Sequence, residues 1–187
     1  MKLIDLTQPW CALTPTWPYF PSSEVTSFHS HHRDHVMSLI IKTNMHSGTH
    51  VDAPLHFNPA GWDMSKVPLE RLYGTGLVVD LSGQVDKYTI ITRAMIEKAL
   101  PDELRKNDIL IVHTGWQKYS WVGEEENEEV YFCKCPGPAE DVTEWLIEKH
   151  VKWAGMDAPS FEHPLNTAIR DYRPDLVKEF EQLMGLK

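Results

Sequence analysis

The sequence predicts an α/β fold, and three observations support this class. Five short segments rich in β-branched and aliphatic residues have the length of strands. Three other segments carry apolar residues at spacings of three and four, which is typical of helices. Strands and helices alternate late in the chain, after a strand-rich first half. At 187 residues, the chain is long enough for a single domain, or one compact domain with an appended arm, around a buried core.

The expected elements follow from these patterns in chain order. The strands are predicted at 2–6, 36–43, 77–81, 109–113 and 151–156, and the helices at 92–100, at 139–150 and from 174 onward. Pro138 stands where the first turn of the second helix tolerates proline, and Val142, Trp145 and Leu146 follow as one apolar stripe. The acidic run EEENEE at 124–129 and the histidine-rich run FHSHHRDH at 28–35 both favour polar loops, the second entering a strand.

Composition indicates which partners the chain has. Hydrophobic residues make up 42% and charged residues 24%, as in soluble globular proteins. A net charge of −9 disfavours nucleic acid and anionic membranes, which require basic patches, so we expect small-molecule partners. No apolar run is long enough to span a membrane, the start MKLIDLTQPW lacks the apolar region of a secretory signal, and the three cysteines do not form an even framework. The sequence therefore predicts a cytoplasmic protein with reduced thiols.

One stretch, MHSGTHVDAPLHF at 45–57, concentrates polar residues that bind metals. A helix is disfavoured there because Gly48 and Pro54 both destabilise helices, proline by about 3 kcal/mol in an interior. In an extended chain, positions 46, 50, 52 and 56 would all face the same way because all are even. The chain must also turn for these side chains to meet, and 47–48 and 53–54 supply the turn residues.

A bent ribbon of this kind predicts a metal site. It would point His46, His50 and Asp52 toward one centre, with His56 a short distance beyond. Two imidazoles and a carboxylate are typical ligands of catalytic zinc, which keeps an open position for water, and such a metal lowers the pKa of that water to about 7. His56 is then the candidate for moving protons. The alternative is four histidine and aspartate side chains that merely line a turn, and the matched spacing disfavours it.

The stretch HSGTHVDAPLH resembles the His-x-Gly-Thr-His-x-Asp-x-Pro-x-His signature of the cyclase-like family of metal-dependent hydrolases, which includes bacterial kynurenine formamidases and isatin hydrolases. The segments IDLTQPW, TPTWPYF, ILIVHTGW and VKWAGMDAPSFEHPLNT resemble further parts of that family. The resemblance implies a swivelling β/β/α domain, a mixed sheet with flanking helices, over 1–187. It also implies His46, His50 and Asp52 as ligands of a zinc or manganese ion, His56 as the general acid/base, and Trp17 facing the substrate.

One departure from the family concerns its second metal position, which formamidases complete with a later histidine and a glutamate near the carboxyl terminus. The last residues here, EFEQLMGLK, contain no such pair. Either the second site is lost, or a partner or other residues complete it, and His163 is one candidate. His113, beside Thr114 and Gly115, is a candidate for the pocket border, with a structural histidine as the alternative.

The resulting prediction is a homodimeric hydrolase that opens a non-peptide C–N bond, in a linear or cyclic amide, through metal-activated water. The resemblance favours an arylformamidase like kynurenine formamidase, and an isatin hydrolase-like cyclic amidase is the alternative. A metal-binding but catalytically inactive relative also stays open, as does a metal-free binding module. Metal content separates the last of these from the others, and turnover separates the rest.

Overall fold

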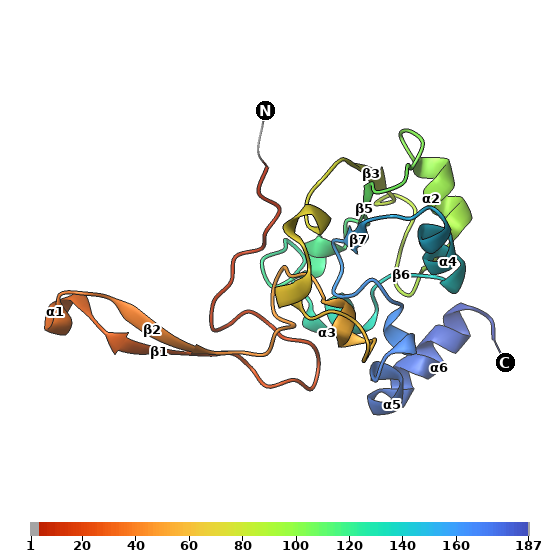
Figure 1. Cartoon of the computed structure of the whole chain (residues 1–187). Coiled ribbons are helices and arrows are strands. Elements are labelled where there is room, and N and C mark those ends of the chain that lie inside the picture. The colour runs from red at the N-terminus through yellow and green to blue at the C-terminus, as the bar shows by residue number, and fades with distance from the viewer. Residues whose placement is uncertain (1–3, 187) are drawn as a thin grey trace. The chain divides into compact units, whose positions relative to one another are not determined.

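The computed structural model describes residues 4–186 and divides into two compact units, Met1–Asp52 and Ala53–Lys187. The first unit contains an antiparallel hairpin of β1 (Glu24–His29) and β2 (Ser38–Lys42), with the short helix α1 (His31–Asp34) at its turn (Figure 1). From residue 4 to the start of β1 the chain is irregular, and Thr16 there forms an isolated bridge with Ser47. Among residues 4–52, antiparallel pairing is thus limited to the hairpin and that bridge.

The second unit is built around a three-stranded parallel sheet. Its strands are β3 (Gly76–Asp80), β5 (Ile109–His113) and β7 (Trp153–Met156), in the order β3-β5-β7. Helices α2 (Arg93–Ala99) and α4 (Glu140–Glu148) lie on one side of this sheet (Figure 1). The core between them is apolar and includes Val79, Leu81, Ile91, Ile96, Leu104, Leu110, Val112, Val142, Trp145 and Leu146. This arrangement confirms the α/β class.

The remaining elements of the second unit are short. They are the parallel pair β4 (Ile90–Ile91) and β6 (Gly137–Pro138), the helices α3 (Glu128–Cys133), α5 (Ile169–Tyr172) and α6 (Pro174–Leu183), and the 3₁₀ turns η1 (Pro54–His56), η2 (Met64–Lys66), η3 (Leu69–Arg71), η4 (Trp116–Tyr119) and η5 (Pro164–Asn166). Lys134 joins α3 to α6, because its ammonium group contacts Glu129 at 3.3 Å and Glu179 at 2.8 Å. In residues 4–186, no helix is long and apolar enough to cross a membrane.

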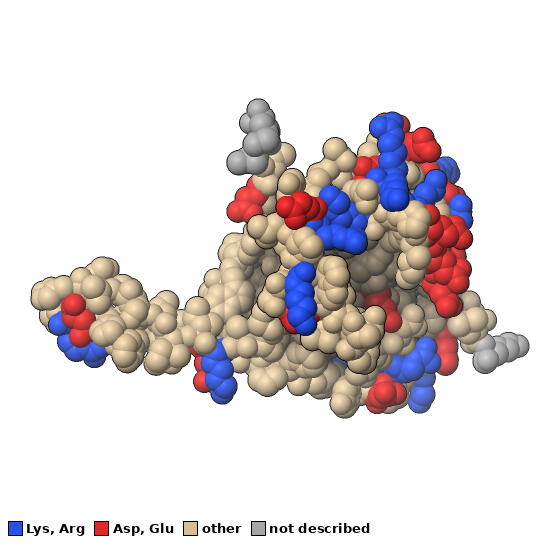
Figure 2. All heavy atoms as spheres, viewed as in Figure 1, with Lys and Arg blue, Asp and Glu red and all other residues tan. Residues whose placement is uncertain are grey.

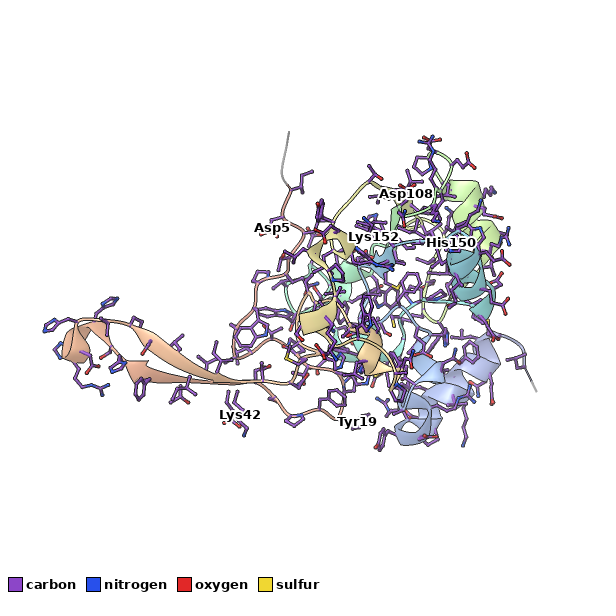
Figure 3. The ribbon with its side chains drawn as sticks, viewed as in Figure 1. Asp5, Tyr19, Lys42, Asp108, His150 and Lys152 are labelled. Atoms are coloured by element: carbon purple, nitrogen blue, oxygen red, sulfur yellow. The ribbon has the colours of Figure 1, made fainter. Side chains whose placement is uncertain are left out.

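Two polar side chains fix the amino ends of the parallel strands. The carboxylate of Asp108, just before β5, accepts the hydroxyl of Thr75 at 2.8 Å and the backbone N–H of Arg105 at 2.9 Å. These hydrogen bonds, the one from Arg105 first, hold the pKa of Asp108 below its ordinary value. Lys152, just before β7, donates to the carbonyls of Glu70 and Tyr73 at 2.9 and 2.8 Å (Figure 3 labels Asp108 and Lys152).

Several predicted elements are confirmed and three are wrong. The strand at 109–113 and the helices at 92–100, 139–150 and from 174 are present within a few residues of their expected ends. Residues 4–6 form no strand, and the rest of the segment predicted at 2–6 lies outside the described residues. The run at 28–35 contains the end of β1 and helix α1 instead of a loop. The acidic run ends inside α3, because Asn127 caps that helix by accepting the N–H of Val130.

Candidate metal centre

The candidate ligand segment, residues 45–52, lies in the first unit shortly after β2 and turns at Gly48. Gly48 has a φ of 68°, in the left-handed region that side chains disfavour. A Cβ at this position would also lie 3.1 Å from Cδ1 of Trp10, which is closer than ordinary contact. Glycine therefore satisfies two requirements here, and the chain reverses as the turn residues predicted.

The irregular segment near the amino terminus anchors this turn. The indole N–H of Trp10 donates to the hydroxyl of Ser47 at 2.9 Å. The backbone N–H of Gln8 donates to the hydroxyl of Thr49 at 3.0 Å. Because these contacts bridge about 40 positions of sequence, the turn is held by tertiary hydrogen bonds and not by local propensity alone.

Three potential metal ligands converge in the first unit. The distance from Nδ1 of His46 to Nε2 of His50 is 3.2 Å, and each of these atoms lies 3.3 to 3.4 Å from Oδ1 of Asp52. Ligands at about 2.0–2.1 Å from a tetrahedral zinc are roughly 3.3 Å apart, so the three atoms have the spacing of one tetrahedral face. In the described residues, this is the group of histidine, cysteine or carboxylate side chains that can hold a metal ion.

The second nitrogen of His50 makes the first one available as a ligand. Nδ1 of His50 lies 2.9 Å from the carbonyl oxygen of Gly48, so it carries the proton and donates it. Nε2 of the neutral ring then presents a lone pair toward His46 and Asp52. A carboxylate and imidazole lone pairs at this spacing repel one another unless a cation or a proton lies between them, so the donor set fits a divalent metal.

Solvent reaches the three side chains of the candidate centre. The side chains of His46, His50 and Asp52 are 25%, 30% and 47% exposed. A site with three protein ligands that solvent can reach resembles catalytic zinc sites, which keep a position open, more than closed structural ones. The aromatic ring of Phe20 lies nearby, with its centroid 6.0 Å from that of His46.

Phe20 was not among the candidates identified from the sequence, whereas Trp17 was. Both lie in one turn of the first unit, where the backbone N–H of Phe20 donates to the carbonyl of Trp17 at 3.0 Å. Trp17 is half-buried and Phe20 is exposed. The sequence signal for Phe20 was its place three residues after Trp17 in the segment TPTWPYF.

The predicted acid/base His56 lies in the second unit, at the end of η1. Pro54 occupies the first position of that turn, and the N–H of His56 donates to the carbonyl of Ala53 at 2.9 Å. The imidazole is exposed and its centroid lies 4.2 Å from the ring of Phe57. The chain thus changes direction at 53–54, where the sequence predicted a turn.

His163 does not provide a ligand in the described structure, which corrects its place among the candidates. The ring is 5% exposed, with Nε2 3.2 Å from the carbonyl of Tyr88 and Nδ1 accepting the N–H of Leu165 at 3.3 Å. Both nitrogens are therefore engaged, and the side chain caps η5. Burial lowers the pKa of His163, because the charged imidazolium is disfavoured away from water.

A second polar group of the second unit lies at the carboxyl ends of the parallel strands. Nδ1 of His113 lies 3.2 Å from Asp80, and its Nε2 lies 3.7 Å from Asp157. Asp157 also accepts three hydrogen bonds from Thr114 and Gly115, at 2.6 to 2.8 Å. Asp157 therefore organises the turn after β5, and His113 joins it to β3.

The family of the chain follows from these features and from sequence comparison. The family model described as putative cyclase matches residues 4–163, which includes the whole ligand segment. The chain belongs to this family. A kynurenine formamidase from Erythrobacter litoralis is 32% identical over 141 residues, which are 75% of this chain and 58% of that protein. The chain spans about half the length of the curated relatives it matches.

Two solved structures share the fold of this chain. An isatin hydrolase bound to the product analogue thioisatinate superimposes with a TM-score of 0.73 at 21% identity, over 86% of this chain and 68% of that one. A potential metal-dependent hydrolase with cyclase activity gives a TM-score of 0.64 at 23% identity, over 91% and 77% of the two chains. These similarities confirm the fold expected from the family resemblance.

Proposed function

We propose that this putative cyclase is a metal-dependent hydrolase that opens a non-peptide carbon–nitrogen bond in a linear or cyclic amide. The observation that carries the proposal is the triangle of donor atoms from His46, His50 and Asp52, whose spacing suits a tetrahedral divalent ion. The kynurenine formamidase relative favours an aryl formamide as the substrate. The reaction class is thus arylformamidase-like hydrolysis.

Each residue has a distinct role in this proposal. His46, His50 and Asp52 would hold a divalent ion, zinc or manganese, which when bound would make water a stronger acid. His56, four positions after Asp52, is the general acid/base that gives a proton to the leaving nitrogen. Trp17 presents a flat apolar surface suited to an aromatic amide, and Phe20, beside His46, adds a second one.

A cyclic amide is the second candidate substrate. The fold similarity to an isatin hydrolase favours it, since hydrolysis of a lactam ring requires the same water and proton donor as hydrolysis of a formamide. A catalytically inactive metal-binding protein is the third candidate, and only turnover distinguishes it. We further propose a homodimer that acts in the cytoplasm. All three cysteines are free, which suits a reducing compartment.

Elemental analysis combined with a hydrolysis screen tests the function. The screen contains N-formyl aromatic amines, isatin and small cyclic amides, and we expect turnover of at least one class with one or more ions per chain. His50→Ala should lose both the metal and the activity, because it removes a ligand atom. His31→Ala, an exposed histidine of α1, is the matched control and should keep both. Equal metal content in wild type and His50→Ala would contradict the assignment.

A further inference from the structure

A cavity of the second unit, termed the cationic cavity, is lined by positively charged side chains. Its volume is about 360 Å³, and its lining residues are Arg71, Lys106, Asn107, Ile147, His150 and Val151. They include an arginine, a lysine and a histidine but no carboxylate, although the chain has 27 acidic residues against 18 lysine and arginine residues. Small-molecule sites have volumes of roughly 300–1,000 Å³, so the cavity is large enough for such a ligand.

The cationic cavity lies at the amino ends of the parallel strands. Lys106 and Asn107 precede β5, and His150 and Val151 precede β7. The polar group around His113 lies at the opposite, carboxyl ends of these strands, so the cavity is separate from it. Figure 2 shows lysine and arginine side chains near the top of the second unit, whereas many acidic side chains line its right edge.

Hydrogen bonds hold the walls of the cationic cavity in place. The backbone N–H of Asn107 donates to the carbonyl of His150 at 3.0 Å, which joins the turn before β5 to the turn before β7. The ammonium group of Lys152 donates to two backbone carbonyls, at 2.9 and 2.8 Å, that flank Arg71 in the chain. The segments that carry the cations are therefore fixed before a ligand binds, which lowers the entropic cost of binding.

The cations of the cavity are available to an external anion. In residues 4–186, neither Arg71 nor Lys106 forms an ion pair with a carboxylate, whereas their neighbour Arg105 pairs with Asp102 at 3.7 Å. The carboxylate of Asp108, in the same turn as Lys106, is already occupied by two hydrogen-bond donors at 2.8 and 2.9 Å. Cations that line one cavity repel one another, and an anion between them relieves this repulsion.

We propose that the cationic cavity binds the phosphate group of a small phosphomonoester. The guanidinium of Arg71 suits this group because its planar fork donates two parallel hydrogen bonds to phosphate oxygens, and Lys106 supplies a point charge. The side chains of Asn107 and His150 add further N–H donors. The permanent charges of Arg71 and Lys106 match the roughly −1.5 to −2 charge of a phosphate monoester at neutral pH, whereas a single carboxylate would balance only one of them.

The apolar lining indicates that the ligand has an organic part. Ile147 and Val151 line the cavity beside the cations, and Ile147 is 69% exposed. An apolar group of the ligand would cover this side chain, and the cavity has room for more than a phosphate ion. The expected ligand is therefore a phosphomonoester with a small apolar or aromatic group. Its binding goes beyond the amide hydrolysis proposed above and does not depend on it.

Isothermal titration calorimetry of the full chain with phenyl phosphate tests the proposal. This probe joins a phosphate monoester to an apolar ring, and we expect one saturable site per chain. Arg71→Gln and Lys106→Gln each remove one charge and should raise the dissociation constant by about tenfold or more. Lys178→Gln is the matched control, because Lys178 is an exposed lysine of α6. It should bind phenyl phosphate as wild type does.

The same titration of His50→Ala separates the cationic cavity from the candidate metal centre, because a bound metal ion would also attract phosphate. Phenyl phosphate should bind His50→Ala with the wild-type dissociation constant. Loss of binding in this variant overturns the cavity as the site. Failure of the protein to hydrolyse amides contradicts the proposed function alone and leaves the titration result intact.

Two further probes test the chemical class of the ligand. Benzoate carries the ring with a single negative charge, and inorganic phosphate lacks the ring, so each should bind about tenfold more weakly than phenyl phosphate. Benzoate that binds as tightly overturns the assignment to phosphate, and inorganic phosphate that binds as tightly overturns the organic part. The site itself is overturned if phenyl phosphate shows no saturable binding, or if both glutamine variants in the cavity keep the wild-type dissociation constant.

Discussion

At the scale of single residues, the candidate site depends on which ring nitrogen of His50 carries the proton. The carbonyl of Gly48 holds the proton of His50 on Nδ1 and so directs the Nε2 lone pair toward Asp52. This carbonyl points toward His50 because the chain reverses at Gly48, a residue in the left-handed conformation. The glycine thus determines ligand orientation as well as backbone direction, which links the spacing of the motif to its chemistry.

Replacing Gly48 with alanine should weaken metal binding. The left-handed conformation costs a residue with a Cβ about 1–2 kcal/mol, and the new methyl group would approach Trp10. The turn should therefore shift and misplace His50. Gly83→Ala is the control, because a Cβ there meets nothing within 4 Å and its backbone is not left-handed. Titration with zinc should show a raised dissociation constant for Gly48→Ala but not for Gly83→Ala. Equal zinc affinities in wild type and Gly48→Ala would contradict the role of the turn at Gly48.

Replacing His56 with alanine should separate proton transfer from metal binding. General acid/base assistance is worth about 10²–10⁴-fold in rate. We therefore expect kcat to fall by that factor while the metal stays bound and KM changes little. Metal stoichiometry and kcat are measured on one preparation. If the metal is lost along with the activity, His56 is a ligand, and if the rate is unchanged, another group carries the proton.

At the scale of elements, η5 depends on a histidine that must stay neutral. His163 packs against Phe180 of α6 at 5.4 Å between ring centroids and bonds to the carbonyl of Tyr88. Its side chain also accepts the N–H of Leu165 at the start of the turn. A protonated ring could not accept the hydrogen bond from Leu165. Protonation of His163 would therefore break the cap, and it would also leave a positive charge buried away from water.

The free energy of unfolding should therefore fall on acidification. Burial lowers the pKa of His163 in the folded state below the ordinary 6.5, so the unfolded chain binds the proton first as the pH falls. The stabilisation is complete above pH 6.5 and is lost progressively below it, down to the folded-state pKa. The free energy of unfolding, measured with urea, should differ less between pH 8 and pH 5 for His163→Asn than for wild type.

His150→Asn is the matched control for that comparison. His150 is exposed in the second unit and has a φ of 55°, a conformation that asparagine tolerates better than most residues. It should keep the wild-type pH dependence. An identical pH dependence in His163→Asn and wild type would contradict the role of burial.

The elements that sequence reasoning identified correctly are those whose signal is local. The strand at 109–113 is a continuous aliphatic run, buried at three of its five positions, and the stripe of Val142, Trp145 and Leu146 fixes α4. β1 was missed because Glu24 to His29 is mostly polar and becomes a strand only through pairing with β2. α3 was missed because its cap, Asn127, follows an acidic run that dominates the local pattern.

The cluster of His46, His50 and Asp52 was predictable from the sequence, and its surroundings were not. The spacing of His46, His50 and Asp52, with a glycine between them, requires only a turn. The contact of Phe20 with His46 depends on how a separate irregular segment folds back, which no periodicity encodes. The same is true of His163, whose two hydrogen bonds are known only from the folded chain.

At the scale of the whole molecule, the ligands and the proposed acid/base lie on opposite sides of a unit boundary. His46, His50 and Asp52 belong to Met1–Asp52, and His56 belongs to Ala53–Lys187. The proposed roles therefore assign metal binding to groups of the first unit and proton transfer to a group of the second. Stability, in turn, rests on the apolar core of the second unit. Acid affects all three properties, and they can be measured separately.

Turnover should rise from acid toward neutral pH for two reasons that belong to the site. Protons compete with a metal for the imidazoles of His46 and His50, so metal affinity falls as the pH falls. The proposed reaction also transfers a proton during each turnover, so its rate depends on pH. The measurement is kcat from pH 5 to pH 9 at saturating metal, which removes the first cause and leaves the second.

Unfolding must be distinguished from a fall in kcat, since protonation of His163 should destabilise the second unit over the same acidic range. Circular dichroism recorded on each sample identifies the pH below which the chain unfolds, and only rates above it are interpreted. His56→Ala gives the decisive comparison, because its rate should stay below that of wild type at every pH at which both proteins are folded and hold the metal. A wild-type rate that is constant from pH 5 to pH 9, with metal bound and the fold intact, would exclude this acid/base chemistry.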